Sequence, residues 1–169
     1  MPWTTYSEAY TSMLKMSNMS MRAGPGRTYR FYKDVPVYPF AFGKTYTTFR
    51  MSWTHTPQQS QSVATLVAGL EYELNVTNTG QRNGSKVVAA FSSFANMHDG
   101  PVKQLFAMEK VHVPVGESKR VILRTNSLPG TCTFCSVDEL GHSMVRPGLF
   151  VVTIGDGGAG PSSTVLKHT

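Results

Sequence analysis

The feature that most constrains the fold is a strict alternation of apolar and polar residues in "GLEYELNVTNTG", residues 69–80. Leu70, Tyr72, Leu74 and Val76 fall on one side of an extended chain, with polar residues between them. A period of two predicts a strand with one buried face, and the Asn-Thr-Gly after it predicts a turn. The stretch therefore favours a sheet over a helical fold.

Similar stretches recur about every ten residues, with turn residues between them, as in an antiparallel sandwich. No segment after residue 60 keeps a 3.6-residue period, so helix is expected to be scarce. We predict an all-β fold with an antiparallel β-sandwich over residues 51–156. The expected strands lie within residues 69–80, 85–94, 103–118, 119–125 and 148–155.

The two ends of the chain differ from this middle part. Residues 1–50 hold seven basic and two acidic residues, which is +5 of the net charge of +6, and 11 of the 18 aromatic residues. Residues 157–169 are rich in Gly, Ser and Pro and are expected to form a flexible tail. We expect residues 1–50 to form an extended arm that mediates assembly. Its candidate contact residues are Tyr29, Arg30, Phe31, Tyr32, Tyr38, Phe40, Phe42, Tyr46 and Phe49.

Three longer stretches resemble a known protein family. "NVTNTGQRNGSKVVAAF", "GPVKQLFAMEKVHVPVGESKRVIL" and "SVDELGHSMVRPGLFVVTIG" resemble landmarks of the domain that ends the family three glycoside hydrolases, β-xylosidases of plants and fungi above all. "MPWTTYSEAY", "MSNMSMR", "PGRTYRFY" and "VYPFAFGKTYTTF" resemble the end of the α/β sandwich domain that precedes it. The resemblance implies a fibronectin type III-like (immunoglobulin-like) sandwich. One departure is that Gly43 is followed by Lys44, Thr45 and Tyr46, whereas the family usually has a Gly-Leu-Ser-Tyr run after the Phe-Gly.

Catalysis by this chain alone is not expected. In the family that the chain resembles, the nucleophile and the acid/base carboxylate lie upstream of the matching part, and glycoside hydrolysis needs two such groups. Glu71 and Glu73 share one face of a strand, where solvated side chains are the usual case. Asp138 and Glu139 lie in an expected turn, where capping is the usual role. No cofactor is predicted.

Metal chemistry has little support. No two of the five histidines have ligand spacing on one element. Cys132 and Cys135 form a Cys-x-x-Cys, but a closed zinc site needs four ligands and no second pair is present. In an oxidising compartment this pair is expected to form a small disulfide, and two separate thiols are the alternative.

Three sequons indicate an extracellular glycoprotein. Asn18, Asn75 and Asn83 each begin an Asn-x-Ser/Thr triplet, and Asn83 lies in a turn that would present a glycan well. The first ten residues lack the basic flank and apolar core of a signal peptide, so a secretion signal would lie upstream of them. No apolar run reaches the roughly 20 residues of a membrane-spanning helix.

The arm decides between the functional hypotheses. Arginines among aromatics resemble a nucleic-acid patch, but no RNA-recognition pattern accompanies them, and nucleic acid is not the expected partner. The arm has three alternatives: it folds back on its own sandwich, packs on another polypeptide, or packs on a neighbouring copy. If the arm of each copy packed on the next copy, the chain would build a homo-oligomer or a filament.

We therefore predict a non-catalytic, secreted structural module that assembles through residues 1–50 with itself or with enzyme domains. The alternatives are a carbohydrate-associated accessory domain, which would bind polysaccharide, and a C-terminal fragment of a family three glycosidase. Sugar binding needs exposed aromatic rings. The sandwich aromatics are expected to lie mostly in the core, with Trp53 as the first residue to test. They are Trp53, Tyr72, Phe91, Phe94, Phe106, Phe134 and Phe150.

Overall fold

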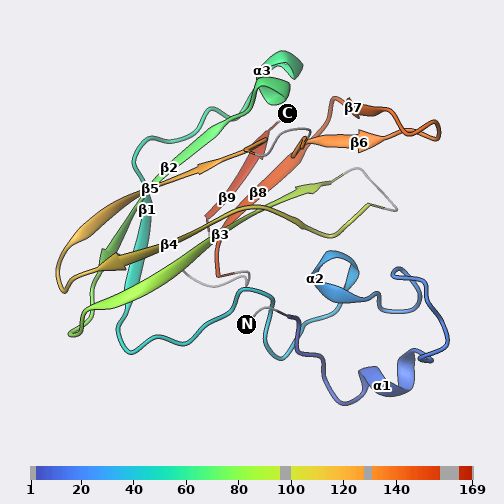
Figure 1. Cartoon of the computed structure of the whole chain (residues 1–169), viewed down its shortest axis with the longest axis horizontal. Helices are drawn as coiled ribbons and strands as arrows, with labels where there is room; N and C mark the ends of the chain where they lie inside the picture. The colour runs from blue at the N-terminus through green and yellow to red at the C-terminus, as the bar shows by residue number, and fades with distance from the viewer. Residues whose placement is uncertain (1–2, 96–99, 128–130, 157–163, 169) are drawn as a thin grey trace.

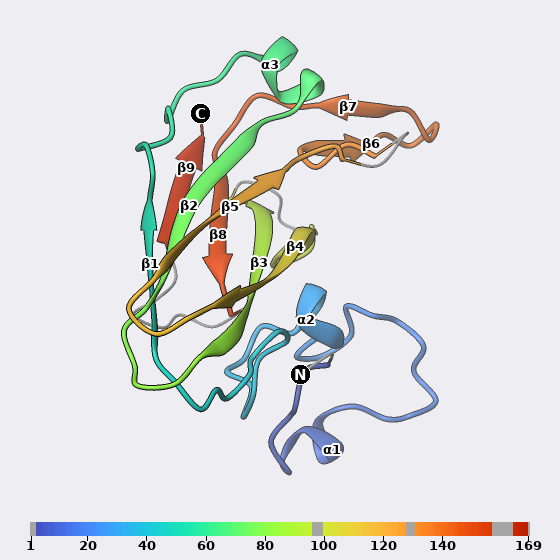
Figure 2. The ribbon, with the colours of Figure 1, turned by 60° about the vertical axis from the view of Figure 1, so that its left-hand side comes forward.

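The structure, a computed structural model, describes residues 3–95, 100–127, 131–156 and 164–168, the last range by its backbone. Figures 1 and 2 show two facing sheets, with the first 48 residues gathered beside one of them. The helices are α1 (Tyr10–Met13), α2 (Thr28–Phe31) and α3 (Val63–Ala68). The strands are β1 (Phe49–Trp53), β2 (Glu71–Asn78), β3 (Gly84–Phe94), β4 (Gln104–Val113), β5 (Ser118–Arg124), β6 (Cys135–Val137), β7 (Ser143–Val145), β8 (Phe150–Gly155) and β9 (Thr164–His168).

The first sheet has the order β1-β2-β5, and both pairings are antiparallel. Strand β2 turns Tyr72, Leu74 and Val76 into the interior, where each is at most 2% exposed. The residues between them are half-buried or exposed. Burial along β2 therefore alternates with the same period of two as the apolar residues in the sequence.

The second sheet has the order β4-β3-β8-β9, again antiparallel throughout. Strand β3 is buried on both faces from Val88 to Ser92. Val88 and Ala90 belong to the core between the sheets, whereas the Phe91 ring meets residues of the first 48. A break in register between Ala90 and Phe91 leaves one extra residue, Phe106, on β4.

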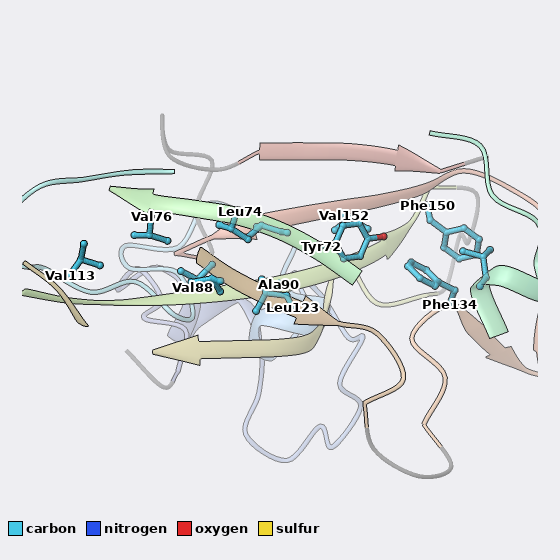
Figure 3. Packing of buried hydrophobic residues seen from close by; sticks show 13 residues of the cluster. Tyr72, Leu74, Val76, Val88, Ala90, Val113, Leu123, Phe134, Phe150 and Val152 are labelled. Atoms are coloured by element: carbon cyan, nitrogen blue, oxygen red, sulfur yellow. The ribbon is translucent and has the colours of Figure 1, made fainter. Parts of the chain in front are cut away.

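Apolar side chains from both sheets fill the space between them, as Figure 3 shows for ten labelled residues. Val76, Val88, Val113 and Val152 have no exposed surface. Burying each such side chain contributes roughly 1.5–3 kcal/mol. The predicted all-β antiparallel sandwich is therefore confirmed.

Two predictions about the ends of the chain need correction. The expected flexible tail contains strand β9, which pairs from Thr164 to His168 with β8. The stretch "TVLKH" favours a strand, and it covers a sheet edge that β8 would otherwise expose. Residues 157–163 and 169 lie outside the described residues. At the other end, the extended arm is not confirmed, because α1, α2 and turns occupy much of the first 48 residues.

The first 48 residues, called the N-terminal segment from residue 3 onward, fold into a compact unit. Backbone bonds from Thr5 to Val37 and Tyr38 form an isolated antiparallel bridge, which brings the start of the segment beside its later part. Gly26 lies at φ +86, and a Cβ there would collide with the backbone oxygen of Phe31. A residue without a side chain is therefore required where the chain enters α2.

Asn78 joins the N-terminal segment to the sandwich. This buried amide accepts hydrogen bonds from the Thr47 hydroxyl at 2.7 Å and from the Gly80 N–H at 3.0 Å. It donates to the backbone oxygens of Arg82 and Val113 at 2.7 and 2.9 Å. All four hydrogen bonds available to an amide side chain are made, which offsets the cost of burying it.

Candidate functional site

An aromatic contact anchors the N-terminal segment on the sandwich. Tyr29 stacks on Phe40, with ring centroids 4.3 Å apart. Both rings also meet Phe91 of β3 edge-on, at 6.0 and 6.2 Å. Phe91 is 1% exposed, so the segment supplies the cover for this part of the outer face of the sheet.

Polar contacts strengthen the same junction. The Val102 N–H donates to the Arg30 backbone oxygen at 2.6 Å, and the Arg30 guanidinium donates to the Gln104 side chain at 3.2 Å. The Leu105 N–H donates to the Tyr29 hydroxyl at 3.5 Å. Helix α2 is therefore held against the start of β4 by both backbone and side-chain bonds.

A second group of rings forms the interior of the segment. Tyr6 stacks on Tyr10 at 4.0 Å, and both meet Tyr32 edge-on. The Tyr10 hydroxyl donates to the Gly26 backbone oxygen at 3.1 Å. Burial, and then the neighbouring Tyr6, raise the pKa of Tyr10, because both disfavour a phenolate there.

Many large apolar side chains of the segment stay exposed. Met16 and Met19 are 86% and 85% exposed, and Tyr46 is 96% exposed. The segment contributes nine of the 17 exposed large apolar residues in the described part of the chain. We call these nine the exposed apolar set. They are Trp3, Met13, Met16, Met19, Met21, Val35, Val37, Tyr38 and Tyr46.

The nine predicted contact residues of the arm therefore divide into two groups. The exposed ones are Arg30, Tyr38 and Tyr46. The others are half-buried or buried within the chain itself: Tyr29, Phe31, Tyr32, Phe40, Phe42 and Phe49. Of the three alternatives for the arm, folding back on the sandwich is the one that the structure displays.

The loop with the unusual sequence after Gly43 borders a groove of about 350 Å³. Phe40 and Phe42 line one side, and Val87 and Met108 of the second sheet line the other. Lys44 also lines it, and Lys44 and Tyr46 are exposed. The lining thus combines apolar side chains with two basic residues, Lys44 from this loop and Lys86 from β3.

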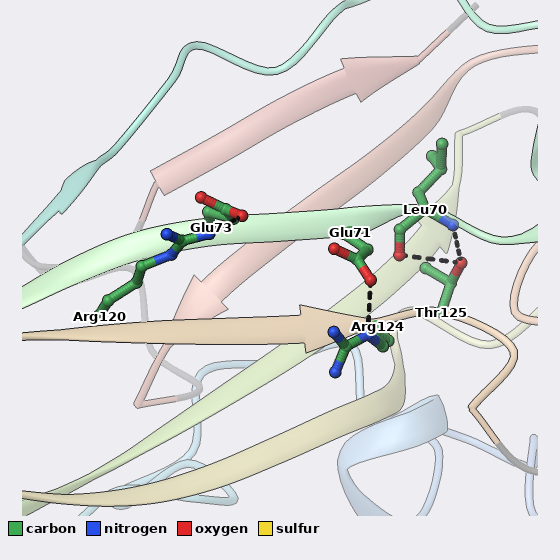
Figure 4. A network of polar contacts seen from close by, with 6 residues as sticks. All are labelled: Leu70, Glu71, Glu73, Arg120, Arg124 and Thr125. Atoms are coloured by element: carbon green, nitrogen blue, oxygen red, sulfur yellow. Dashed lines mark hydrogen bonds and ion pairs between the residues drawn. The ribbon is translucent and has the colours of Figure 1, made fainter.

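The paired carboxylates on β2 are engaged in ion pairs. Figure 4 shows Glu71 facing Arg124 and Glu73 facing Arg120 across the β2–β5 pairing. Glu71 accepts from the Arg124 guanidinium at 2.6 Å, and Glu73 accepts from Arg120. Each carboxylate is occupied by a cation on the surface, which is a poor arrangement for acid–base chemistry.

Asp138 caps the turn between β6 and β7. Its carboxylate accepts from the N–H groups of His142 at 2.8 Å and Leu140 at 2.9 Å. These hydrogen bonds, that from His142 first, hold the pKa of Asp138 below its ordinary value. Glu139 beside it is exposed. The turn role inferred for this acidic pair describes Asp138 well.

The two cysteines lie beside the core. Cys132 and Cys135 are joined in a disulfide that flanks the buried Phe134. Within the described ranges, no group of three or more His, Cys, Asp or Glu side chains is placed to hold a metal ion. No helix in that part of the chain is long and apolar enough to cross a membrane.

The predicted glycan acceptors differ in exposure. Asn18 and Asn83 are exposed, whereas Asn75 is half-buried within β2, between Ser52 of β1 and Arg120 of β5. The Asn83 side chain accepts from the Val115 N–H at 3.0 Å. Asn18 and Asn83 are therefore the more accessible acceptors, and glycosylation stays a prediction.

Sequence reasoning missed a pocket of about 340 Å³ at the edge of the sandwich. Arg22 and Arg30 reach it from the N-terminal segment, and Arg146 reaches it from the chain after β7. The three arginines are far apart in sequence and form no motif. Only the folding of the segment onto the sheet brings them together.

No family model matches the chain. Beta-D-xylosidase 3 of Arabidopsis thaliana is 33% identical over 200 residues, which take in 100% of this chain and 24% of that protein. Beta-D-xylosidase 1 of the same plant is 32% identical, with the same coverage. Exo-1,4-beta-xylosidase bxlB of Emericella nidulans is 30% identical over 91% of this chain and 21% of its own length. The chain spans about a quarter of the length of the first two relatives.

Solved structures show the same relationship. The family three exo-beta-xylosidase XlnD superposes with a TM-score of 0.78 at 21% identity, over 98% of this chain and 23% of that one. A beta-glucosidase from Kluyveromyces marxianus superposes with a TM-score of 0.65 at 27% identity, over 85% and 17%. The chain belongs to the glycoside hydrolase family three and corresponds to the C-terminal part of these enzymes.

Proposed function

We propose that this chain is the non-catalytic C-terminal part of a glycosidase that acts on β-xylosides, and that it docks on the catalytic part through its N-terminal segment. The observation that carries the proposal is the alignment of the whole chain with about a quarter of each Arabidopsis β-xylosidase. This interpretation puts the alternative of a C-terminal glycosidase fragment ahead of the predicted structural module, which was to assemble with itself or with enzyme domains.

The exposed apolar set supports a docking role. Large apolar side chains exposed in water favour association, and nine of them lie on the N-terminal segment. The Tyr29, Phe40 and Phe91 contact fixes the inner side of the segment on the sandwich. A partner would therefore meet a preorganised surface, which lowers the entropic cost of association.

The described carboxylates give no support to catalysis by the chain alone. A retaining or inverting glycosidase holds two carboxyl groups roughly 5–9.5 Å apart across the scissile bond. Glu71 and Glu73 are paired with arginines, and Asp138 accepts backbone N–H bonds in a turn. These three carboxylates thus have structural contacts rather than the arrangement of a catalytic pair.

A chimera tests the docking proposal. The part of Beta-D-xylosidase 3 that aligns with this chain is replaced by the chain, and hydrolysis of an aryl β-xyloside is compared with that of the truncated enzyme. We expect the chimera to recover activity that the truncated enzyme lacks. Val35→Asp, at a site 88% exposed in the segment, should lower the recovered activity about tenfold by opposing association.

Val115→Asp is the matched control, because Val115 is 46% exposed but lies at the β4–β5 turn. It should leave the recovered activity unchanged. A chimera no more active than the truncated enzyme, while the chain alone is folded, would overturn the proposal.

Self-assembly is the second candidate, and the same exposed apolar set favours it. Light scattering with electron microscopy on the purified chain separates the two. Regular polymers or closed oligomers would favour assembly between copies, and a compact monomer would favour docking on a catalytic part. An extracellular location is part of the proposal, supported by the Cys132–Cys135 disulfide and the exposed sequons at Asn18 and Asn83.

Binding to polysaccharide through aromatic rings has less support. The seven sandwich aromatics are all buried or half-buried, Trp53 among the half-buried ones. Tyr72 packs between Trp53 and Phe106, at 6.3 and 6.0 Å. A polysaccharide pull-down that retains the chain and loses it on Trp53→Ala would restore this alternative.

A further inference from the structure

The arginine pocket introduced above lies where three parts of the molecule meet. Helix α2 and the chain before it supply Arg30 and Arg22, and the end of β3 supplies Ser92 and Phe94. The β6–β7 hairpin and the chain after it close the remaining side with Arg146. In Figures 1 and 2, α2 and the hairpin project on the same side of the sheets.

Among the described residues, three arginines and no carboxylate line the pocket. No described carboxylate forms an ion pair with Arg22, Arg30 or Arg146. The guanidinium groups of Arg22 and Arg30 lie 5.1 and 5.6 Å from the centre of the Phe31 ring, so one ring contacts both cations. Guanidinium groups bind carboxylates through paired, charge-assisted hydrogen bonds, so the pocket favours an anion.

The rest of the lining fits a polyhydroxylated ligand. The Ser92 hydroxyl donates to the Thr133 backbone oxygen at 3.4 Å, and that of Ser136 donates to the Met144 oxygen at 3.5 Å. Both hydroxyl oxygens keep lone pairs that accept from a ligand hydroxyl. Phe94 adds an apolar surface, stacked on Phe150 at 4.7 Å. The volume lies within the range of about 300–1,000 Å³ that is typical of small-ligand sites.

We propose that this pocket binds a sugar acid, with the carboxylate on the arginines and the ring hydroxyls on the serines and Gln104. The inference rests on the proposed function, in which the chain is part of an enzyme that acts on sugars, and a sugar that carries a carboxylate uses both the arginines and the hydroxyl groups of the lining. A neutral sugar would bring no negative charge to three guanidinium groups that have no ion pair with any carboxylate of the described residues. A small inorganic anion would leave the hydroxyl-bearing wall unused.

Titration of the full-length chain with sodium glucuronate tests the proposal. Amide shifts followed by NMR at low ionic strength, with xylose and acetate as parallel ligands, give the three affinities. We expect glucuronate to bind about tenfold more tightly than xylose or acetate, since each of these offers half of the contacts. Arg146→Gln and Arg30→Gln should each weaken glucuronate binding about tenfold.

Arg82→Gln removes the same charge from an exposed site outside the pocket and should leave the affinity unchanged. Arg146 has no hydrogen bond or ion pair within the described chain, so its variant should fold normally, as a melting curve verifies. Equal binding of acetate and glucuronate, or equal binding of xylose and glucuronate, would overturn the proposal. So would an affinity that Arg146→Gln leaves intact.

The titration uses no catalytic part. A failure to bind glucuronate therefore counts only against the proposed sugar-acid pocket. The docking proposal is tested separately, by the activity of the chimera. Binding of glucuronate together with an inactive chimera would support the pocket and count against docking.

Discussion

The N-terminal segment and the sandwich both rely on aromatic and aliphatic burial, but they achieve it differently. The sandwich closes around its own core, in which Val76, Val88 and Val152 have no exposed surface. The segment has small ring clusters, a single backbone bridge outside its turns, and nine large apolar side chains in water. From this difference we expect the sandwich to keep its fold when the segment is detached, whereas the segment depends on a neighbouring surface.

The largest expected effect comes from the sandwich core. Leu123 of β5 is 2% exposed, so Leu123→Ala should lower the free energy of unfolding by about 2–5 kcal/mol. Met16 of the segment is 86% exposed, and Met16→Ala should change it by less than about 0.5 kcal/mol. Urea denaturation followed by fluorescence measures both. Equal losses would show that the two regions share one core.

The next largest effect separates the segment from the sandwich. Tyr29→Ala removes the ring that stacks on Phe40 and meets Phe91, and the attachment should weaken by about 2–3 kcal/mol. Limited proteolysis should then cut the N-terminal segment faster, while the β3 amides keep their protection from hydrogen exchange. Tyr46→Ala, at a residue 96% exposed, is the matched control and should change neither. Loss of β3 protection in the Tyr29 variant would mean that the sandwich needs the segment to fold.

The sandwich was predictable because its signal is local. Alternation along β2 places Tyr72, Leu74 and Val76 on one face whatever the rest of the chain does. Helix α3 was missed because it has only six residues, too few to show a 3.6-residue period. Its start is fixed instead by Ser62, whose hydroxyl accepts from the Thr65 N–H at 3.2 Å.

The candidate sites were less predictable because they depend on contacts between distant residues. The aromatic residues of the arm were identified, but that Tyr29 and Phe40 would meet Phe91 has no sequence signature. The same holds for the pocket, where Arg30 and Arg146 are separated by most of the sandwich. The composition of residues 1–50 indicated an apolar surface that needs a partner. Which of its residues the sandwich covers depends on how the chain folds.

The disulfide of the sandwich should stabilise the sandwich without affecting the N-terminal segment. The loop closed by Cys132 and Cys135 has about four residues, for which chain entropy predicts a stabilisation of about 2 kcal/mol. Reduction should lower the free energy of unfolding by that amount and leave proteolysis of the N-terminal segment unchanged. Denaturation with and without a thiol reductant measures the difference. The double variant Cys132→Ser, Cys135→Ser should be insensitive to the reductant, and a sensitive one would place the effect elsewhere.

The smallest expected effect is a pH dependence confined to the β6–β7 hairpin. Backbone bonds from His142 and Leu140 hold the pKa of Asp138 below that of an unfolded aspartate, about 3.9. The carboxylate therefore stabilises the turn above the unfolded pKa, and this contribution is lost as the pH falls through the folded pKa.

An NMR titration of the Asp138 carboxyl carbon should give a midpoint below about 3.9, and the Leu140 and His142 amide signals should move with it. In Asp138→Asn these two amides should no longer respond over that pH range. A midpoint at or above the ordinary value would mean that solvent competes successfully for both N–H groups, and the hairpin would then owe its shape to the β6–β7 pairing alone.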